Sequence, residues 1–120
     1  MRVRQTFTAD DRIRKRTEYQ RVYDRGHKIS SRSFTLFLLE NELRRPRLGI
    51  TVTRRAGGAV QRIRAKRMLR EWFRKLKQDL PPVDLVINAR EGLHRMTPAA
   101  LSRELETRLR GLVRPGGGRS

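Results

Sequence analysis

The chain has 120 residues, enough for one small domain with a single hydrophobic core but too few for two. Its 30 Lys and Arg residues against 12 Asp and Glu give a formal net charge of +18, and the resulting self-repulsion destabilises a compact state unless a polyanion relieves it. Cysteine is absent, which excludes disulfides, thiolate nucleophiles and thiolate metal ligands.

The N-terminal part of the sequence predicts a basic arm followed by a helix. Residues 1–16 lack a hydrophobic period, and we expect an extended arm with one short turn. Thr17 and Gln20 match a capping box, so we expect Thr17 to cap the helix and Gly26 to end it as a left-handed stop. Three residues of this helix, at positions i, i+3 and i+4, share one face: Tyr19, Val22 and Tyr23.

Three segments have the composition of β-strands. Residues 33–40 are apolar on both faces, whereas residues 47–53 alternate and would bury one face. Because residues 41–46 form a short connection, we expect these two strands to pair as an antiparallel hairpin. Residues 83–89 predict a third, mostly apolar strand, which we expect at the centre of the sheet.

A long basic helix is predicted at residues 59–78. The region 54–77 holds ten of the thirty basic residues against one acid, Glu71. At 100° per residue the helix has a core face and a cationic face, each about 100° wide. The core face consists of Ala65, Leu69, Trp72, Phe73 and Leu76, and the cationic face of Lys66, Arg67, Arg70, Arg74 and Lys77. Such a helix can pack into the domain while it presents guanidinium groups to phosphates.

Two residues break this pattern. Arg62 projects toward the apolar side, so we expect either an irregular first turn or a side chain that extends over the edge of the core. Ile63 projects into the middle of the cationic face, where contact with RNA, contact with another protein and no function at all remain open. We expect Ile63→Asn to leave the stability nearly unchanged, with RNA binding unchanged or tighter.

The C-terminal part predicts one more helix. After a loop at residues 91–96, Thr97 is the expected N-cap and Pro98 the first helical position. The helix carries a leucine stripe: Leu101, Leu105, Leu109 and Leu112. Residues 114–120 are predicted to be disordered. Residues 1–113 are predicted to form one small α+β domain of order α-β-β-α-β-α, with a mainly antiparallel sheet packed by helices.

No residue pattern indicates an active site of the protein's own. His27 and His94 are predicted in loops and share no motif. Three acidic pairs lack metal-ligand spacing and are better explained by helix capping or charge balance: Asp10 with Asp11, Glu40 with Glu42, and Glu104 with Glu106. Asp84 is expected to have a structural role at a strand end. We therefore predict no catalytic residue and no metal site in the protein.

The basic helix also carries a recognisable motif. Residues 57–74 read GGAVQRIRAKRMLREWFR. This segment resembles the motif G-N-A-V-x-R-N-R-x-K-R-x-x-R-E-x-F-R of the protein subunit of bacterial ribonuclease P. The resemblance extends to residues 16–26, 47–52 and 80–86 and covers roughly residues 7–112. One departure from the motif matters, because Ile63 stands where the family has Asn, an amide that both donates and accepts hydrogen bonds.

The resemblance implies an accessory protein whose RNA partner is the catalyst. Ribonuclease P RNA removes the 5′ leader from precursor tRNA in an Mg²⁺-dependent hydrolysis, so Mg²⁺ would be held through the RNA and not by a protein site. The partners implied are this RNA and precursor tRNA, with no membrane and no small-molecule substrate. The fold implied includes a left-handed β-α-β crossover through the basic helix, although the opposite hand is the general rule.

Two groups of binding residues follow from the resemblance. The residues expected to bind the catalytic RNA are Arg54, Arg55, Arg62, Arg64, Lys66, Arg67, Arg70 and Arg74. The leader would lie in a cleft between the first helix and the sheet, because aromatic side chains in a cationic groove stack on unpaired bases. The cleft candidates are Arg12, Arg16, Tyr19, Tyr23, Lys28 and Phe37. The alternative for both tyrosines is to anchor the helix to the sheet, and we assign Phe34, Trp72 and Phe73 to the core.

Two other functions fit the composition. A basic ribosomal or assembly protein of similar fold would bind structured RNA without processing it. A DNA-binding module with helix 59–78 in the major groove fits less well, because the middle of the basic face has no Asn or Gln to read bases. No run approaches about 18 apolar residues, and the N-terminus has no apolar signal-peptide core, so a cytoplasmic location is expected.

Overall fold

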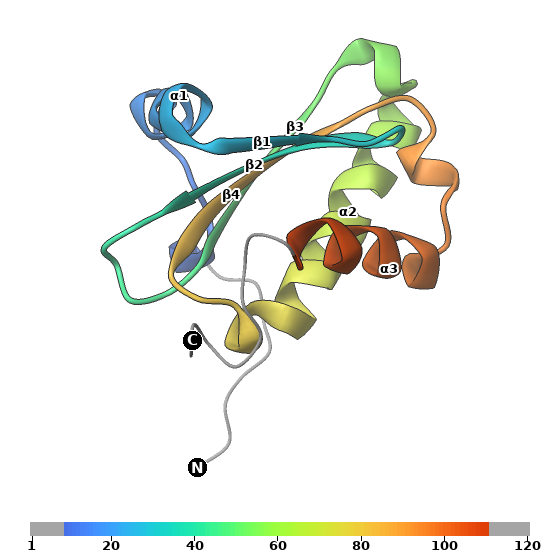
Figure 1. Ribbon diagram of the computed structural model, residues 1–120. Helices are drawn as coiled ribbons and strands as arrows, with labels where there is room; N and C mark the ends of the chain where they lie inside the picture. Colours follow the sequence, from blue (N-terminus) through green and yellow to red (C-terminus); the bar gives the residue numbers. More distant parts are fainter. Residues whose placement is uncertain (1–8, 111–120) are drawn as a thin grey trace.

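The computed structural model describes residues 9–110 of the chain (Figure 1). The first residues of the predicted arm, Leu112 and the predicted tail at 114–120 lie outside the described residues. The described part contains helices and strands in the order α1 (Arg16–Arg25), β1 (His27–Ser30), β2 (Phe34–Glu40), β3 (Arg47–Val52), α2 (Ala59–Leu76), β4 (Val83–Ala89) and α3 (Pro98–Leu109). Single 3₁₀ turns lie between them: η1 (Ala9–Asp11), η2 (Arg54–Ala56), η3 (Lys77–Asp79) and η4 (Leu93–Arg95).

The strands form one mixed sheet of order β1-β2-β4-β3. β4 pairs antiparallel with β2 and parallel with β3, and β1 pairs antiparallel with β2. The predicted hairpin between residues 33–40 and 47–53 is therefore wrong, because β4 lies between these two strands. β4 is mostly apolar and is buried on both faces along most of its length, and the position between two neighbouring strands removes most of its apolar surface from water. Its predicted central position is confirmed.

The connection from β3 through α2 to β4 joins two adjacent parallel strands, which makes it the β-α-β crossover that the family resemblance implies. The hand of this crossover stays a prediction. β1 was not predicted, and His27, expected in a loop, begins β1 and pairs with Leu38. β1 has one apolar residue, Ile29, so no alternation indicates a strand, and it forms because the edge of β2 offers backbone partners.

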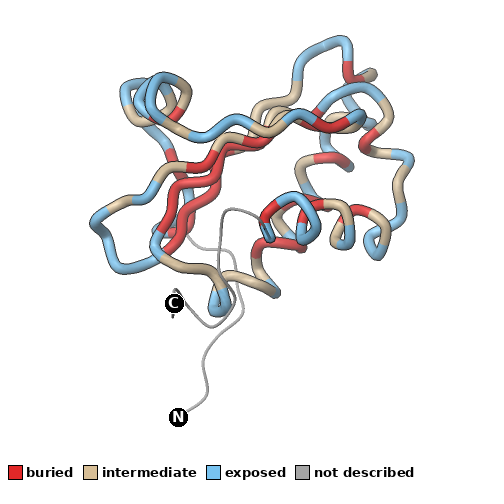
Figure 2. Tube along the Cα trace, in the orientation of Figure 1, coloured by how far each residue is buried: buried red, intermediate tan, exposed pale blue. Residues whose placement is uncertain are grey.

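The elements form three layers, with α2 and α3 on one face of the sheet and α1 on the other (Figure 1). The larger core lies on the α2–α3 face and includes Phe34, Trp72 and Phe73, which confirms their predicted burial. The smaller core lies under α1 and consists of Ile13, Val22 and Val86 with half-buried aromatic side chains around them. Figure 2 shows that the buried residues follow the central strands, whereas α1 is exposed along most of its length.

The start of α1 differs from the predicted capping box. Lys15, not Thr17, is the N-cap, and its N–H donates to Glu18 Oε1 at 3.4 Å. Glu18 accepts the Lys15 N–H and also reaches across to Arg47, and both bonds favour a helix that starts after Lys15. Thr17 therefore lies within the first turn. Gly26 does follow the helix, but its φ of −77° is not left-handed. A glycine is needed there because a Cβ would lie 2.4 Å from the Val22 carbonyl oxygen.

The described part of the N-terminal arm, residues 9–15, is docked on the sheet. Ile13 N–H donates to the Leu48 carbonyl at 3.0 Å, and the Ile13 side chain is buried. Asp11 forms an ion pair of 2.8 Å with Lys77 at the end of α2. The predicted short turn is present as η1 and residues 12–15 form no helix, whereas the docking of the arm on the sheet was not predicted. Ile13 is the apolar anchor that the basic residues around it conceal in the sequence.

A candidate nucleic-acid interface at the edge of β3

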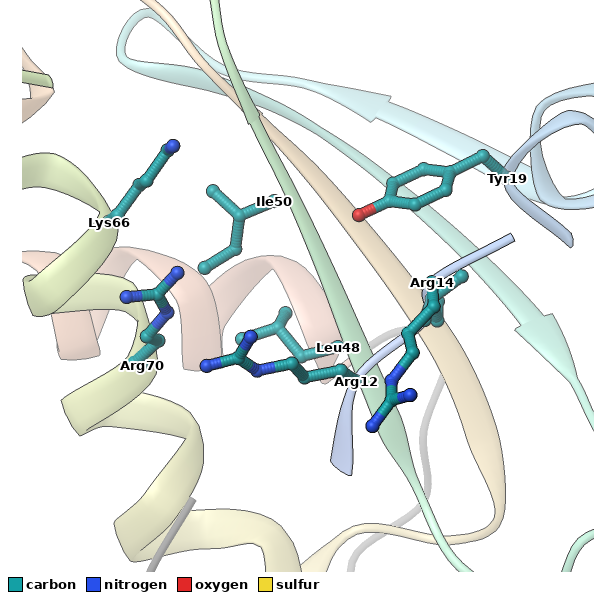
Figure 3. A pocket seen from close by; sticks show the side chains of 8 residues that line it. Arg12, Arg14, Tyr19, Leu48, Ile50, Lys66 and Arg70 are labelled. Atoms are coloured by element: carbon teal, nitrogen blue, oxygen red, sulfur yellow. The ribbon is translucent and has the colours of Figure 1, made fainter. Parts of the chain in front are cut away.

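A cationic pocket of about 290 Å³ lies along the edge of β3, where the arm, α1 and α2 meet (Figure 3). Its lining includes four basic side chains and no carboxylate: Arg12, Arg14, Lys66 and Arg70. Ile13, Leu48 and Ile50 form its apolar floor, and Tyr19 closes it on the side of α1. We call this site the β3-edge pocket.

The pocket exists because two segments far apart in the sequence are fixed against the same strand. Lys66 and Arg70 are four residues apart and therefore lie on one face of α2. The arm reaches them because its backbone bonds to Leu48 and Asp11 pairs with Lys77. Four cations held around one small cavity repel one another unless an anion lies between them. The arrangement suits one or more phosphate groups of a polyanion.

Tyr19 adds an aromatic ring and a hydroxyl to this pocket. Figure 3 shows the hydroxyl pointing into the pocket. Burial raises the pKa of Tyr19, and the Ile50 N–H that the phenol oxygen accepts offsets part of that rise. The hydroxyl therefore stays protonated at neutral pH and can donate to a phosphate oxygen. The ring lies against Gly49, where a Cβ would be only 2.7 Å from Tyr19 Cε1, so glycine is what lets the ring approach the strand.

An aromatic cluster extends from Tyr19 across the α1 face of the sheet. The rings of Tyr23 and Phe37 make an edge-to-face contact at 4.9 Å, and the Tyr19 and Tyr23 centroids are 6.5 Å apart. Lys28 Nζ lies 5.9 Å from the centre of the Phe37 ring. The structure thus brings together four of the six predicted cleft residues: Tyr19, Tyr23, Lys28 and Phe37. Tyr23 is the most engaged, since its hydroxyl also donates to Asn88 Oδ1 at 3.2 Å.

Of the other two predicted cleft residues, Arg12 lies near Tyr19, because both line the β3-edge pocket. Arg12 belongs to the β3-edge pocket with Lys66 and Arg70, which had been assigned to the other RNA-binding group. Arg16 is exposed at the first residue of α1. The two predicted groups therefore meet at the edge of β3. Arg14, which the sequence analysis did not select, completes the pocket, and only the docking of the arm reveals it.

The eight cations predicted to bind the catalytic RNA, which lie in η2 and α2, fall into two sets. Arg54 and Arg55 in η2, and Arg67 on α2, are exposed, and Lys66 and Arg70 line the β3-edge pocket. The remaining three are engaged or shielded within the protein. Arg64 Nε donates to the His94 carbonyl at 2.7 Å, and Arg74 pairs with Glu71 at 2.7 Å. Arg62 lies in a regular helical turn, half-buried with its Nε shielded from solvent, so the predicted irregular first turn is wrong.

A buried ion-pair network fixes α1 to the sheet, and we call it the Asp84 clamp. Arg47 donates to both carboxylate oxygens of Asp84, at 3.0 and 2.8 Å, and to Glu18 Oε2 at 3.2 Å. Asn41 Nδ2 donates to Asp84 Oδ1 at 2.8 Å. Burial raises the pKa of Glu18, but the hydrogen bonds from Arg47 and the Lys15 N–H outweigh it, so the net pKa is lowered. Asp84 has the predicted structural role, whereas its partner Arg47 was not foreseen.

Several other acidic residues form ion pairs with nearby arginines. Asp10 pairs with Arg45 at 3.7 Å, and Glu104 with Arg108 at 3.0 Å. Across residues 9–110, no three His, Asp or Glu side chains gather as a metal site would require. His94 lies in η4, and the described helices are each too short or too polar to cross a bilayer.

Comparison with known proteins identifies the family. The sequence model of the family described as Ribonuclease P matches residues 7–113. The chain belongs to the bacterial ribonuclease P protein family. A ribonuclease P protein component from Syntrophus aciditrophicus is 42% identical over 101 residues, 83% of this chain and 85% of the relative. The ribonuclease P protein of Staphylococcus aureus superposes with a TM-score of 0.76 at 35% identity, covering 83% of this chain and 93% of that one. The ribonuclease P protein of Thermotoga maritima superposes with a TM-score of 0.74 at 28% identity, covering 84% of this chain and 96% of that one.

A ribonuclease P protein is a subunit of an RNA-processing ribonucleoprotein, so this chain binds RNA and acts in the maturation of tRNA 5′ ends. Membership rules out the two alternatives of a ribosomal protein and a DNA-binding module. It also agrees with the α+β fold, since the relatives share the arrangement of helices around the sheet.

Proposed function

We propose that α2 and the β3-edge pocket bind phosphates of the catalytic RNA, and that the aromatic cluster holds the 5′ leader of precursor tRNA. The observation that carries the proposal is the meeting of Arg12, Arg14, Lys66 and Arg70 around one cavity without a carboxylate. Tyr19 lies between the pocket and the cluster, so one continuous surface could contact both RNAs.

The proposed contribution of the protein is electrostatic. Cleavage would be carried out by the RNA with Mg²⁺, in the cytoplasm, where precursor tRNA is made. Two RNA molecules repel each other through their phosphates, and both Mg²⁺ and a protein of charge +18 reduce that repulsion. The protein would therefore lower the Mg²⁺ concentration that cleavage requires.

Reconstitution tests the proposed function. At low Mg²⁺, adding the chain to a bacterial ribonuclease P RNA is expected to accelerate cleavage of a precursor tRNA with a leader of several nucleotides. The control is a polyarginine peptide of equal charge, which should not reproduce the acceleration if the fold matters. No acceleration over RNA alone would overturn the proposal.

Leader binding by the aromatic cluster is tested by removing its rings. Tyr19→Leu and Phe37→Leu keep apolar volume but lose stacking, which is worth about 1–3 kcal/mol per base. We expect affinity for the leader-bearing substrate to fall about 5- to 100-fold, with binding of mature tRNA unchanged in the same titration. Phe34→Leu, in the larger core, is the control and should not separate the two substrates. Equal losses for both substrates in the Tyr19 variant would indicate a packing role only.

A further inference from the structure

The outward face of α2 is apolar over its first turns and cationic beyond them. Val60 and Ile63 are 77% and 57% exposed, and among residues 9–110 the only other large hydrophobic residue so exposed is Leu43. Val60 and Ile63 are three residues apart on one helix, so they lie on the same face. In the sequence Ile63 stands out alone, whereas the structure shows that Val60 is exposed beside it.

Neither packing nor helix propensity explains this pair. Both side chains lie outside the larger core of the sheet. Both are β-branched, and straight-chain residues or alanine would favour a surface helix more. A contact with another molecule would explain why two aliphatic side chains face outward together.

The surroundings of the pair indicate which molecule fits. Lys66 and Arg67 follow Ile63 at i+3 and i+4, on the same side of the helix. The Arg64 guanidinium is engaged with the His94 carbonyl, and Val60 and Ile63 remain exposed. An apolar patch bordered by cations matches a nucleotide, which presents the apolar face of its base close to anionic phosphates. A second copy of a chain of charge +18 would instead bring cation against cation.

We propose that Val60 and Ile63 form a nonpolar contact with an unstacked nucleotide of the RNA partner, while Lys66 and Arg67 bind the neighbouring phosphates. This inference rests on the proposed function, because the occupant is the RNA that the basic face binds. The family motif has Asn in place of Ile63, and an amide can hydrogen-bond a base edge where isoleucine cannot. In this chain the two side chains instead pack against an exposed base or sugar of fitting shape and exclude water from it. The effect expected of Ile63→Asn on RNA affinity is thereby reversed. The variant should bind RNA more weakly, because its amide would face an apolar surface.

Salt-dependent binding separates this contact from the ionic ones. The probe is the ribonuclease P RNA encoded in the same genome, titrated with wild type and with the double variant Val60→Thr, Ile63→Asn between 50 and 400 mM salt. We expect the double variant to bind about 5- to 20-fold more weakly. The slope of log K against log salt should stay the same, because no cation is lost. Arg67→Ala is the matched control on the same face, and it should reduce that slope by about 0.9.

Three outcomes are informative. Both substituted side chains are exposed, so the thermal midpoint of the double variant should move by less than about 3 °C. A larger loss would overturn the inference, because it would assign the pair a structural role. Unchanged RNA affinity of the double variant, with a steep wild-type slope, would also overturn it and leave the proposed function intact. A flat wild-type slope would instead count against the proposed function itself.

Discussion

Asp84→Ala is expected to lower the free energy of unfolding by about 3–5 kcal/mol. Asp84 is fully buried, and its removal leaves the buried Arg47 guanidinium without the carboxylate that it binds through two hydrogen bonds. Denaturant unfolding at neutral pH, followed by circular dichroism, measures the loss. The same change should loosen α1, because Arg47 also holds Glu18 in its first turn.

Two further variants make this prediction specific to burial. Glu104→Ala removes a partly exposed ion pair with Arg108 and should cost less than about 1 kcal/mol. The double variant Arg47→Met, Asp84→Leu replaces both charges by apolar groups and should recover most of the lost stability. The account of the Asp84 clamp is wrong if Asp84→Ala costs no more than Glu104→Ala.

Replacing Lys66 and Arg70 together by alanine is expected to weaken RNA binding roughly 50- to 100-fold at 0.1 M salt. Both side chains line the β3-edge pocket, and each phosphate contact that is lost reduces the slope of log K against log salt by about 0.9. For wild type, contact with about six phosphates predicts a loss of about 10³ in affinity between 50 and 200 mM salt. Filter binding or fluorescence titration across this range measures both quantities.

The matched control is Arg103→Ala on α3, an exposed cation outside the β3-edge pocket. It removes the same formal charge as either single substitution, so any general effect of net charge appears in it as well. The pocket variant removes two charges and the control one. If its losses in log K and in salt slope are no larger than twice those of Arg103→Ala, the pocket has no special role in binding.

The β3-edge pocket and the aromatic cluster also explain how one small protein could contact two RNA molecules. Lys66 and Arg70 reach the pocket from the α2 face of the sheet, and Tyr19 reaches it from the α1 face. β3 is an edge strand, so the two faces are continuous only around its side. Under the proposed function, the catalytic RNA and the leader would approach from opposite faces and meet at this edge.

Features that depend on local pattern were predicted from the sequence. The two faces of α2 follow from its 3.6-residue period, and Trp72 and Phe73 are buried where that period places them. The cap at Thr97 is also local, since its side chain accepts the Ala100 N–H three residues on, at 3.0 Å. β4 was expected at the centre because a strand that is apolar on both faces must be covered on both.

Features that depend on distant partners were not predicted. A short connection between 33–40 and 47–53 permits a hairpin but does not require one, and β4 pairs more favourably with both strands. Arg47 and Asp84 are 37 residues apart, and no local pattern distinguishes a buried arginine from the many exposed ones. The exposure of Val60 likewise follows from where α2 meets the sheet.

The sequence by itself determined that the protein binds a polyanion, and its motif indicated the family, because charge and helical period are properties of neighbouring residues. Only the tertiary structure decided which cations act together. Arg12 and Arg14 join Lys66 and Arg70 because Ile13 docks the arm on β3 and Asp11 ties it to Lys77. These contacts join residues more than thirty positions apart, and their energy depends on burial that only the folded chain provides.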